Sequence, residues 1–276
     1  MFEKFSRSWE LVKASAAVLR SDKELLLFPV FSSIATLIVV TTFLVPTFAL
    51  RIFEQGMGPA GFVLAFAFYL CQYFVIFFFN AALVSAAVIR LEGGNPTLAD
   101  GFNGARARIV PILGYAAIAA TVGMLLQALK SRENNFLVRM LGSGLGVAWT
   151  LSTFLVVPVL VQRNVGPIDA IKESVALLKR TWGENAIGNV GLGAVFGLAS
   201  VLLIVFAAVV VIAALNISAT LAITLALVAV LALVVLAVVQ SALSGIYSAA
   251  LYRYATVGEA PAGFEGTGLQ RAFAPK

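Results

Sequence analysis

The sequence contains no histidine and a single cysteine, Cys71. Without histidine, the chain cannot build a His-ligated zinc site, a His-ligated haem or a Ser-His-Asp triad. With one cysteine it cannot form an intrachain disulfide. Charge is also scarce, because Asp, Glu, Lys and Arg make up 12% of the residues, about half the share in a soluble domain. These absences exclude common metal and catalytic sites and disfavour an ordinary soluble enzyme.

Apolar residues are abundant instead. They make up 61% of the 276 residues, and the mean hydropathy is +1.00. A soluble domain has only about 45–50% apolar residues, and a membrane span needs about 20 of them in a row. The sequence predicts one all-α, polytopic membrane domain over residues 1–255, followed by a short mobile cytoplasmic tail over 256–276. The six predicted transmembrane helices cover about 25–50, 60–89, 109–129, 141–162, 187–214 and 218–252.

Amphipathic helices are predicted in front of each pair of spans, over residues 2–22, about 97–108 and 167–182. The order of amphipathic helix, span and span therefore occurs three times. Residue identity between the three units is poor, so this is an architectural repeat and not a demonstrated duplication. The apolar stripe of the first amphipathic helix is formed by Phe2, Phe5, Trp9, Val12, Ala16 and Leu19.

The basic residues predict the orientation of the chain. Fifteen of the 19 Lys and Arg residues lie before the first span, after the second, after the fourth or after the sixth. Cytoplasmic segments of membrane proteins carry such an excess. We therefore expect both termini and all three amphipathic helices in the cytoplasm. The same rule explains the net charge of +6 without a nucleic-acid partner.

Several stretches of the sequence look familiar. They include SRSWELVKASAAVLRSDKELLLFPVFS at 6–32, Phe28-Pro29, Val157-Pro158 and Lys179-Arg-Thr-Trp-Gly-Glu184. In these stretches the chain resembles an uncharacterised family of bacterial integral membrane proteins, a domain of unknown function. The resemblance implies a six-span protein of the bacterial cytoplasmic (inner) membrane. It implies no activity and no functional residues.

Polar residues within the spans are few and uncharged. No Asp, Glu, Lys or Arg lies near the middle of a predicted span, which disfavours proton-coupled and ion-coupled transport. The neutral polar residues either line a polar pathway or hydrogen-bond to neighbouring helices, and the second interpretation is preferred. They are Gln72, Asn80, Gln127 and Gln240.

Small residues are expected where helices pack closely, because the absence of side-chain bulk lets two backbones approach. The sequence leaves open whether such contacts lie within one chain or between subunits. A phosphate-binding loop is excluded, since no strand precedes the glycines and no Gly-Lys-Ser follows them. The predicted packing residues are Gly142, Gly144, Gly146, Gly193, Gly197, Ser241, Ser244, Gly245 and Ser248.

Basic and tryptophan side chains on the amphipathic helices predict contact with lipid headgroups or with a protein partner. An alternative is that these helices only cap the bundle. The contact residues are Lys4, Trp9, Lys13, Arg20, Arg106, Arg108, Lys172, Lys179, Arg180 and Trp182.

The functional hypothesis is a non-enzymatic inner-membrane protein that organises lipids or a membrane complex. It has anionic lipids as partners, with a homo-oligomer or another membrane protein as further possible partners. The alternative is an oligomeric passive channel or uncoupled small-solute transporter. We expect no cofactor, and no catalytic constellation is visible, because the acidic residues lie in loops and amphipathic segments.

Overall fold

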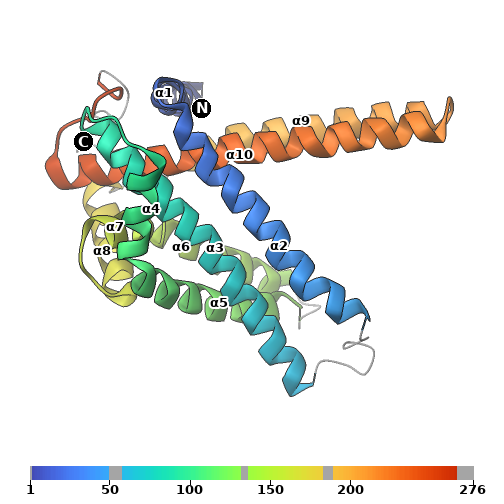
Figure 1. Cartoon of the computed structure of the whole chain (residues 1–276), viewed down its shortest axis with the longest axis horizontal. Helices are drawn as coiled ribbons and strands as arrows, with labels where there is room; N and C mark the ends of the chain where they lie inside the picture. Colours follow the sequence, from blue (N-terminus) through green and yellow to red (C-terminus); the bar gives the residue numbers. More distant parts are fainter. Residues whose placement is uncertain (1, 50–57, 132–135, 183–188, 266–276) are drawn as a thin grey trace.

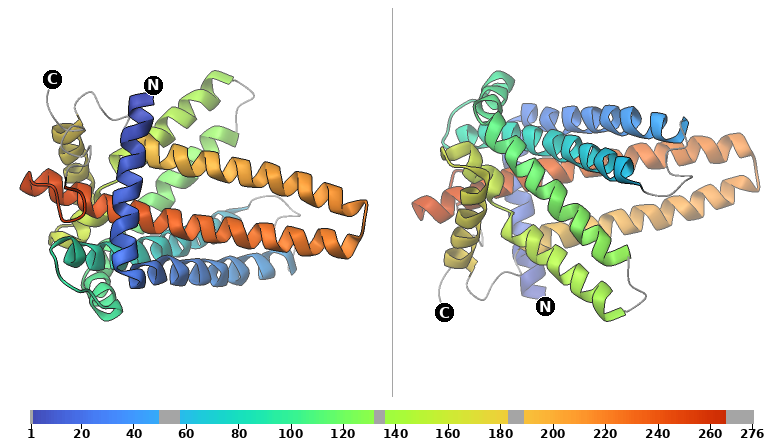
Figure 2. Two further views of the ribbon diagram at one scale, coloured as in Figure 1. Left: turned by 90° about the horizontal axis from the view of Figure 1, so that it is seen from above. Right: turned by 90° about the horizontal axis from the view of Figure 1, so that it is seen from below.

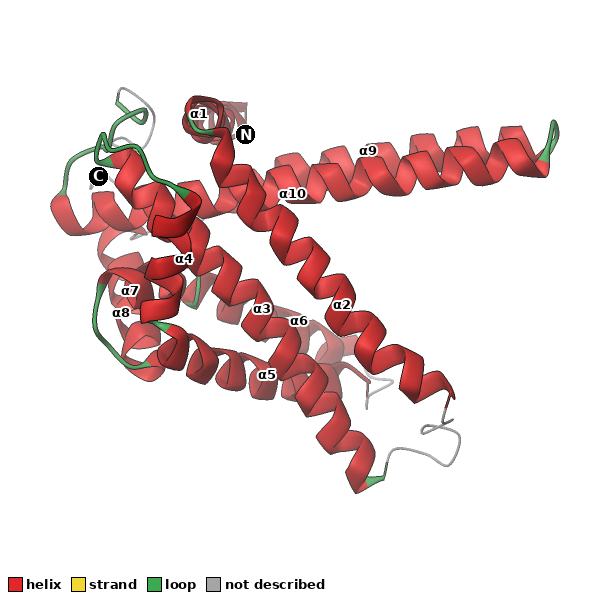
Figure 3. Cartoon of the chain, in the orientation of Figure 1, coloured by secondary structure: helices red, strands yellow, loops and turns green. Residues whose placement is uncertain are grey.

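The structure is a computed structural model of the chain, and it describes residues 2–49, 58–131, 136–182 and 189–265. Every regular element in these residues is a helix, and none of them forms a strand (Figure 3). Within these described ranges, six helical segments are long and apolar enough to cross a membrane. The chain is therefore an all-α, multi-pass membrane protein, as its apolar runs predict.

A further helix precedes each pair of membrane-spanning helices. It is α1 before α2 and α3, α4 before α5 and α6, and α8 before α9 and α10, so the predicted order is observed three times. The elements are α1 (Phe2–Ser21), the 3-10 helix η1 (Lys23–Leu26), α2 (Leu27–Ala49), α3 (Pro59–Leu91), α4 (Leu98–Ala107), α5 (Ile109–Ser131), α6 (Phe136–Ser152), α7 (Val156–Gln162), α8 (Pro167–Trp182), α9 (Asn189–Leu215) and α10 (Ala219–Val257).

The long helices form three hairpins that diverge from one end of the molecule (Figures 1 and 2). These hairpins are α2–α3, α5–α6 and α9–α10. At the end from which they diverge lie α4, α7, α8 and the final turns of α3 and α10. We call this end the hub. Helix α1 crosses the α9–α10 hairpin and contacts both of its helices (Figure 2).

The core lies in the hub, where the second half of α3 meets the second half of α10. Both segments are rich in buried alanine, over Ala81–Ala87 and Ala242–Ala250. Small side chains let these backbones approach closely. Helix α3 is central to the fold, since it contacts α2, α4, α5, α7 and α10.

Helix α4 packs on this core through two glycines. A Cβ atom at Gly101 would lie 2.4 Å from Cζ of Phe28 and 2.8 Å from the carbonyl oxygen of Ala82. At Gly104 it would lie 1.9 Å from Oγ of Ser85. Because no other residue type leaves this space empty, these glycines set how closely α4 approaches α2 and α3.

The first turn of α4 is fixed by a capping box. The hydroxyl of Thr97 accepts a hydrogen bond from the backbone N–H of Asp100, and the Asp100 carboxylate accepts one from the Thr97 backbone. The Thr97 hydroxyl also donates to the Asp100 carboxylate. This bond, and then the bond from the Thr97 backbone, lower the pKa of Asp100 below its ordinary value, because both stabilise the charged form. The helix therefore begins at a defined residue, which holds Gly101 in register against α3.

The predicted span over 141–162 contains a break, because α6 ends at Ser152 and α7 begins at Val156. Pro158 has no N–H group to continue the helical ladder. The hydroxyl of Ser174, a buried residue of α8, donates to the carbonyl of Ser152 at 2.7 Å and accepts from the N–H of Leu155 at 3.2 Å. A side chain from another helix thus satisfies backbone groups that the break leaves free.

Ser174→Ala should lower the stability of the protein by about 1–3 kcal/mol, because the buried N–H of Leu155 and the partly buried carbonyl of Ser152 lose their partner. Thermal unfolding of the purified protein, followed by tryptophan fluorescence, measures this loss. The matched control is Ser200→Ala, since the Ser200 hydroxyl bonds only to Phe196 in its own helix. Equal unfolding temperatures for the two variants would refute the bridging role.

Four of the glycines predicted to pack helices together have no close neighbour within the described chain. A Cβ atom at Gly144, Gly146, Gly193 or Gly197 would meet nothing within 4 Å. These four residues therefore do not pack two described helices together, and their role between subunits stays a prediction. Gly245 does pack, because a Cβ atom there would lie 2.4 Å from Leu83 of α3. The surroundings of Gly142 lie outside the described residues.

The expectation of a mobile tail from residue 256 is wrong for the described part of that segment. Helix α10 continues to Val257, and Gly258 ends it with a positive φ of 84°. Phe264 is then fully buried and belongs to the hydrophobic core. The preceding Gly263 also has a positive φ, and a Cβ atom there would lie 3.1 Å from Val18 of α1. This segment is anchored to the hub.

Candidate functional site

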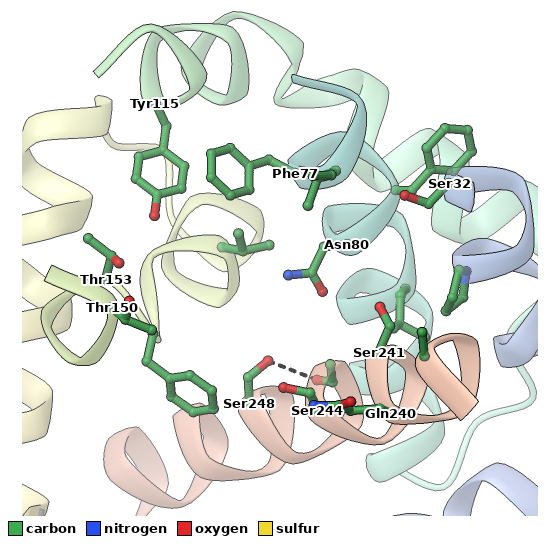
Figure 4. A pocket seen from close by; sticks show the side chains of 18 residues that line it. Ser32, Phe77, Asn80, Tyr115, Thr150, Thr153, Gln240, Ser241, Ser244 and Ser248 are labelled. Carbon is green, nitrogen blue, oxygen red and sulfur yellow. Dashed lines mark hydrogen bonds between the residues drawn. The ribbon is translucent and has the colours of Figure 1, made fainter. Parts of the chain in front are cut away.

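A cavity of about 410 Å³ lies where the three hairpins meet (Figure 4). Its wall comes from α2, α3, α5, α10 and the region around the α6–α7 break. No lining residue is Asp, Glu, Lys or Arg. The polar lining residues are Ser32, Asn80, Tyr115, Thr150, Thr153, Gln240, Ser241, Ser244 and Ser248.

Helical spacing explains why α10 contributes so many of these groups. Gln240, Ser244 and Ser248 follow one another at intervals of four residues, so they lie on one face of the helix. Gly245 lies beside them and allows α10 to approach α3, where a Cβ atom would also come within 3.2 Å of the Asn80 amide oxygen. The close approach of α3 and α10 thus brings the amide of Asn80 beside the polar face of α10.

Some polar groups in the wall are already hydrogen-bonded. The Ser248 hydroxyl donates to the carbonyl of Gly245 at 2.8 Å (Figure 4). The hydroxyls of Thr150 and Thr153 donate to carbonyls one turn earlier, at 2.9 and 2.8 Å. The Tyr115 hydroxyl hydrogen-bonds with Thr153. These four side chains form a wall whose hydrogen bonds lie within the protein.

Other polar groups in the wall have no such partner. Among the described residues, nothing hydrogen-bonds with the side-chain amides of Asn80 and Gln240 or with the hydroxyls of Ser32, Ser241 and Ser244. Asn80, Gln240, Ser32 and Ser244 are partly buried and Ser241 is exposed, so these groups are accessible from the cavity. The cavity therefore offers two amides and three hydroxyls to whatever fills it.

Charged groups lie one helical turn beyond the cavity. Tyr252, four residues after Ser248 on α10, hydrogen-bonds with Arg163. Arg163 also pairs with Glu173 of α8 at 2.9 Å. The hydrogen bond with Tyr252, and then the charge of Glu173, raise the pKa of Arg163. These bonds join α8, α10 and the end of α7 at the hub.

A second ion pair closes the same end of the molecule. Arg253 of α10 pairs with Glu92, which follows the last residue of α3. Because both cations have acidic partners, they hold helices together instead of supplying free positive charge to the cavity.

The four neutral polar residues predicted from the sequence have different surroundings. Asn80 and Gln240 line the cavity together. Gln72 instead donates from its side chain to the Thr36 hydroxyl of α2 at 3.1 Å, and Gln127 is exposed on α5. The predicted packing residues Ser241, Ser244 and Ser248 also lie in the cavity wall.

The predicted headgroup-contact residues are mostly exposed where the structure describes them. Lys13 lies over the Trp9 ring, with Nζ 5.8 Å from the ring centroid. The other described residues of this set are Arg20, Arg106 and Lys179, which are exposed, Arg108, which bonds to Asn164, and Lys172, which pairs with Asp169 at 3.3 Å. The side chains of Lys4, Arg180 and Trp182 lie outside the described residues.

Sequence reasoning missed four polar residues of the cavity, namely Ser32, Tyr115, Thr150 and Thr153. Serine and threonine in a helix commonly bond to a carbonyl of their own helix, so a pattern of these residues does not indicate a cavity. The described residues also contain no group of three or more His, Cys, Asp and Glu that could hold a metal ion.

A comparison with sequence models of protein families identifies the family of the chain. The sequence model of DUF6159, described as a family of unknown function, matches residues 59–264. The chain belongs to DUF6159. The match to DUF6159 covers α3 to α10, including the whole cavity wall except Pro29 and Ser32 of α2. Comparisons with curated proteins and with solved structures give no match.

Proposed function

We propose that this protein binds anionic lipid at the hub and thereby organises lipids or a membrane complex, without enzymatic activity, in the bacterial inner membrane. The observation that carries this proposal is the position of α1. Its buried face, which includes Leu11, Val12 and Val18, lies toward the protein, whereas Trp9 is 44% exposed and lies beside Lys13. Tryptophan and a basic residue turned outward suit the level of lipid headgroups.

Helices α4 and α8 support lipid binding at the same end of the molecule as α1. Helices α4 and α8 lie at the hub with the C-terminal end of α10 (Figure 1). Arg106 and Lys179 on these helices are exposed. We propose that the hub faces the cytoplasm, since most basic residues of the chain lie in the segments that meet there.

The diverging hairpins support an organising role. Along α9 and α10 many large apolar side chains are exposed, including Phe206, Leu227 and Leu231. Such surfaces are stable only against lipid or another membrane protein. We propose that lipid tails, a second copy of the chain or another membrane protein covers these exposed apolar surfaces.

Replacing Lys13, Arg20 and Arg106 together by glutamine should weaken binding of phosphatidylglycerol roughly a hundredfold. Each basic group near an anionic surface contributes about 1 kcal/mol, and 1.4 kcal/mol corresponds to a factor of ten. Native mass spectrometry of the delipidated protein, titrated with phosphatidylglycerol or phosphatidylcholine, measures the affinity.

The matched control removes three exposed acidic charges, as Glu10→Gln, Glu24→Gln and Glu259→Gln. It contains the same number of substitutions and should not weaken phosphatidylglycerol binding. The proposal fails if the basic variant binds phosphatidylglycerol as tightly as the unaltered protein, or if both variants lose binding equally.

A passive channel or uncoupled transporter is the second candidate, and one observation favours it. Asn80 and Gln240 lie in the same polar cavity. A path along the spans would also need polar groups further from the hub. Gln72 bonds to Thr36 and Gln127 is exposed on α5, so neither extends the polar wall of the cavity.

A further inference from the structure

We propose that the cavity between the hairpins binds an uncharged, hydroxyl-bearing group, such as the headgroup of diacylglycerol or a free polyol. The inference deepens the proposed function, on which it rests for a lipid as the source of this group. It concerns a site distinct from the basic surface of α1, α4 and α8. Its volume of about 410 Å³ lies within the range of small-molecule sites, about 300–1,000 Å³.

The wall selects against charged ligands. None of its residues is ionised at neutral pH, and the nearby Arg163 and Arg253 already pair with Glu173 and Glu92. A phosphate or an ammonium group in the cavity would lose its hydration without gaining a countercharge, which is costly. The headgroup of an anionic phospholipid therefore suits the basic outer surface and not the cavity.

The unpaired groups of the wall match hydroxyls. Asn80 and Gln240 each offer a carbonyl oxygen that accepts and an NH₂ group that donates. Ser32, Ser241 and Ser244 add hydroxyls that can do both. A ligand hydroxyl also donates and accepts, so the one free hydroxyl of a diacylglycerol can donate to one amide and accept from the other, and a free polyol can pair with the serine hydroxyls as well.

The depth of the cavity places it at headgroup level. Asn80 is as far along α3 from Pro59 as Gln240 is along α10 from Ala219. At about 1.5 Å per residue, each lies roughly 30 Å from the distal end of its helix, the thickness of the hydrocarbon core. On both helices the polar wall thus lies about one hydrocarbon thickness from the distal end, which suits a site at headgroup level on the hub side.

Apolar side chains line the edge of the cavity that faces away from the hub, toward the membrane-spanning parts of the helices. Ile76 of α3 and Ala237 of α10 are lining residues that are also exposed. Inside, the rings of Phe77 and Tyr115 stack with centroids 4.4 Å apart. An acyl chain leaving the cavity would pass over Ile76 and Ala237 into lipid. This arrangement favours a lipid as the carrier of the hydroxyl group.

The test uses the full chain in detergent, titrated in separate arms with dioleoylglycerol, phosphatidylglycerol and free glycerol, with bound mass read by native mass spectrometry. Asn80→Leu and Gln240→Leu should each weaken binding of dioleoylglycerol about tenfold. The matched control, Gln127→Leu, removes an exposed amide outside the cavity and should leave this affinity unchanged.

Folding is checked separately. Size-exclusion elution and thermal unfolding of each variant are compared with those of the unaltered protein. If a leucine variant fails to fold, Ser244→Ala replaces it, since it removes one hydroxyl with little change in volume. It should weaken dioleoylglycerol binding about threefold.

Each arm decides a part of the proposal. If the leucine variants of Asn80 and Gln240 lose binding of dioleoylglycerol, the proposal is supported with a lipid as the ligand. If they lose binding of free glycerol instead, the recognition of hydroxyls is supported, with a free polyol as the ligand. The proposal is overturned if the affinity for neither compound depends on these amides. It is also overturned if the affinity for phosphatidylglycerol depends on them as strongly. Loss of phosphatidylglycerol binding only in the Lys13, Arg20 and Arg106 variant separates the basic surface from the cavity.

Discussion

Gly101→Ala is expected to destabilise the protein by about 2 kcal/mol, within the range for overpacking a core. The new Cβ atom would lie 2.4 Å from Phe28 Cζ and 2.8 Å from the Ala82 carbonyl. Phe28 is itself almost fully buried, so its ring cannot move aside, and a backbone carbonyl moves only with its helix. The gain in helix propensity from glycine to alanine, about 1 kcal/mol, offsets only part of the cost.

The measurement is thermal unfolding followed by tryptophan fluorescence, with an expected fall of about 6 °C. Gly197→Ala is the matched control, because it places the same methyl group in a helix where nothing lies within 4 Å. An unfolding temperature for Gly101→Ala equal to that of the control would show that α4 does not pack on α3 as described.

Phe264→Ala is expected to cost about 3–5 kcal/mol, the usual loss when a buried phenylalanine is truncated. Phe264 is fully buried in the hub, although it lies beyond the last helix. Without its ring, the segment after Gly258 loses its anchor beside α1. We therefore expect a lower unfolding temperature together with faster proteolytic cleavage after residue 258.

Val257→Ala serves as the comparison for this variant, since Val257 is an exposed apolar residue of the same region. It should change neither the unfolding temperature nor the cleavage rate. Cleavage of Phe264→Ala at the rate of the unaltered protein would contradict the anchoring role of Phe264.

The spans could be predicted from the sequence because a long apolar run has few alternatives to a membrane helix. The break between α6 and α7 could not be located in this way. Pro158 removes a helical hydrogen bond, but the position of the break also depends on Ser174, which belongs to another helix. Such a contact is visible only when α8 is placed beside α7.

The buried face of α1 shows a second limit. Val12 of the predicted apolar stripe is buried, but Trp9 of the same stripe is exposed, and the buried face also includes Ala14, Ser15 and Val18, which the stripe leaves out. Small residues contribute little hydropathy but allow close packing against α9 and α10. Trp9, a large aromatic member of the stripe, is exposed.

The packing role of the glycines and the position of the cavity could be predicted from the sequence only in part, because both depend on contacts between helices. Whether a glycine packs depends on the element opposite it, so Gly101 beside Phe28 matters to the fold and Gly144 meets no neighbour. Asn80 and Gln240 were recognisable because amides are rare in spans. Their shared cavity follows from the crossing of α3 and α10, which no single segment encodes.

An experimental structure of the protein in nanodiscs containing phosphatidylglycerol and diacylglycerol tests the central claim most directly. The account predicts an ordered anionic headgroup beside Trp9 and Lys13, with the membrane boundary at the hub and no continuous aqueous path between the hairpins. A water-filled passage running from the Asn80–Gln240 cavity to the opposite face, with no lipid on α1, would contradict the account and favour a channel.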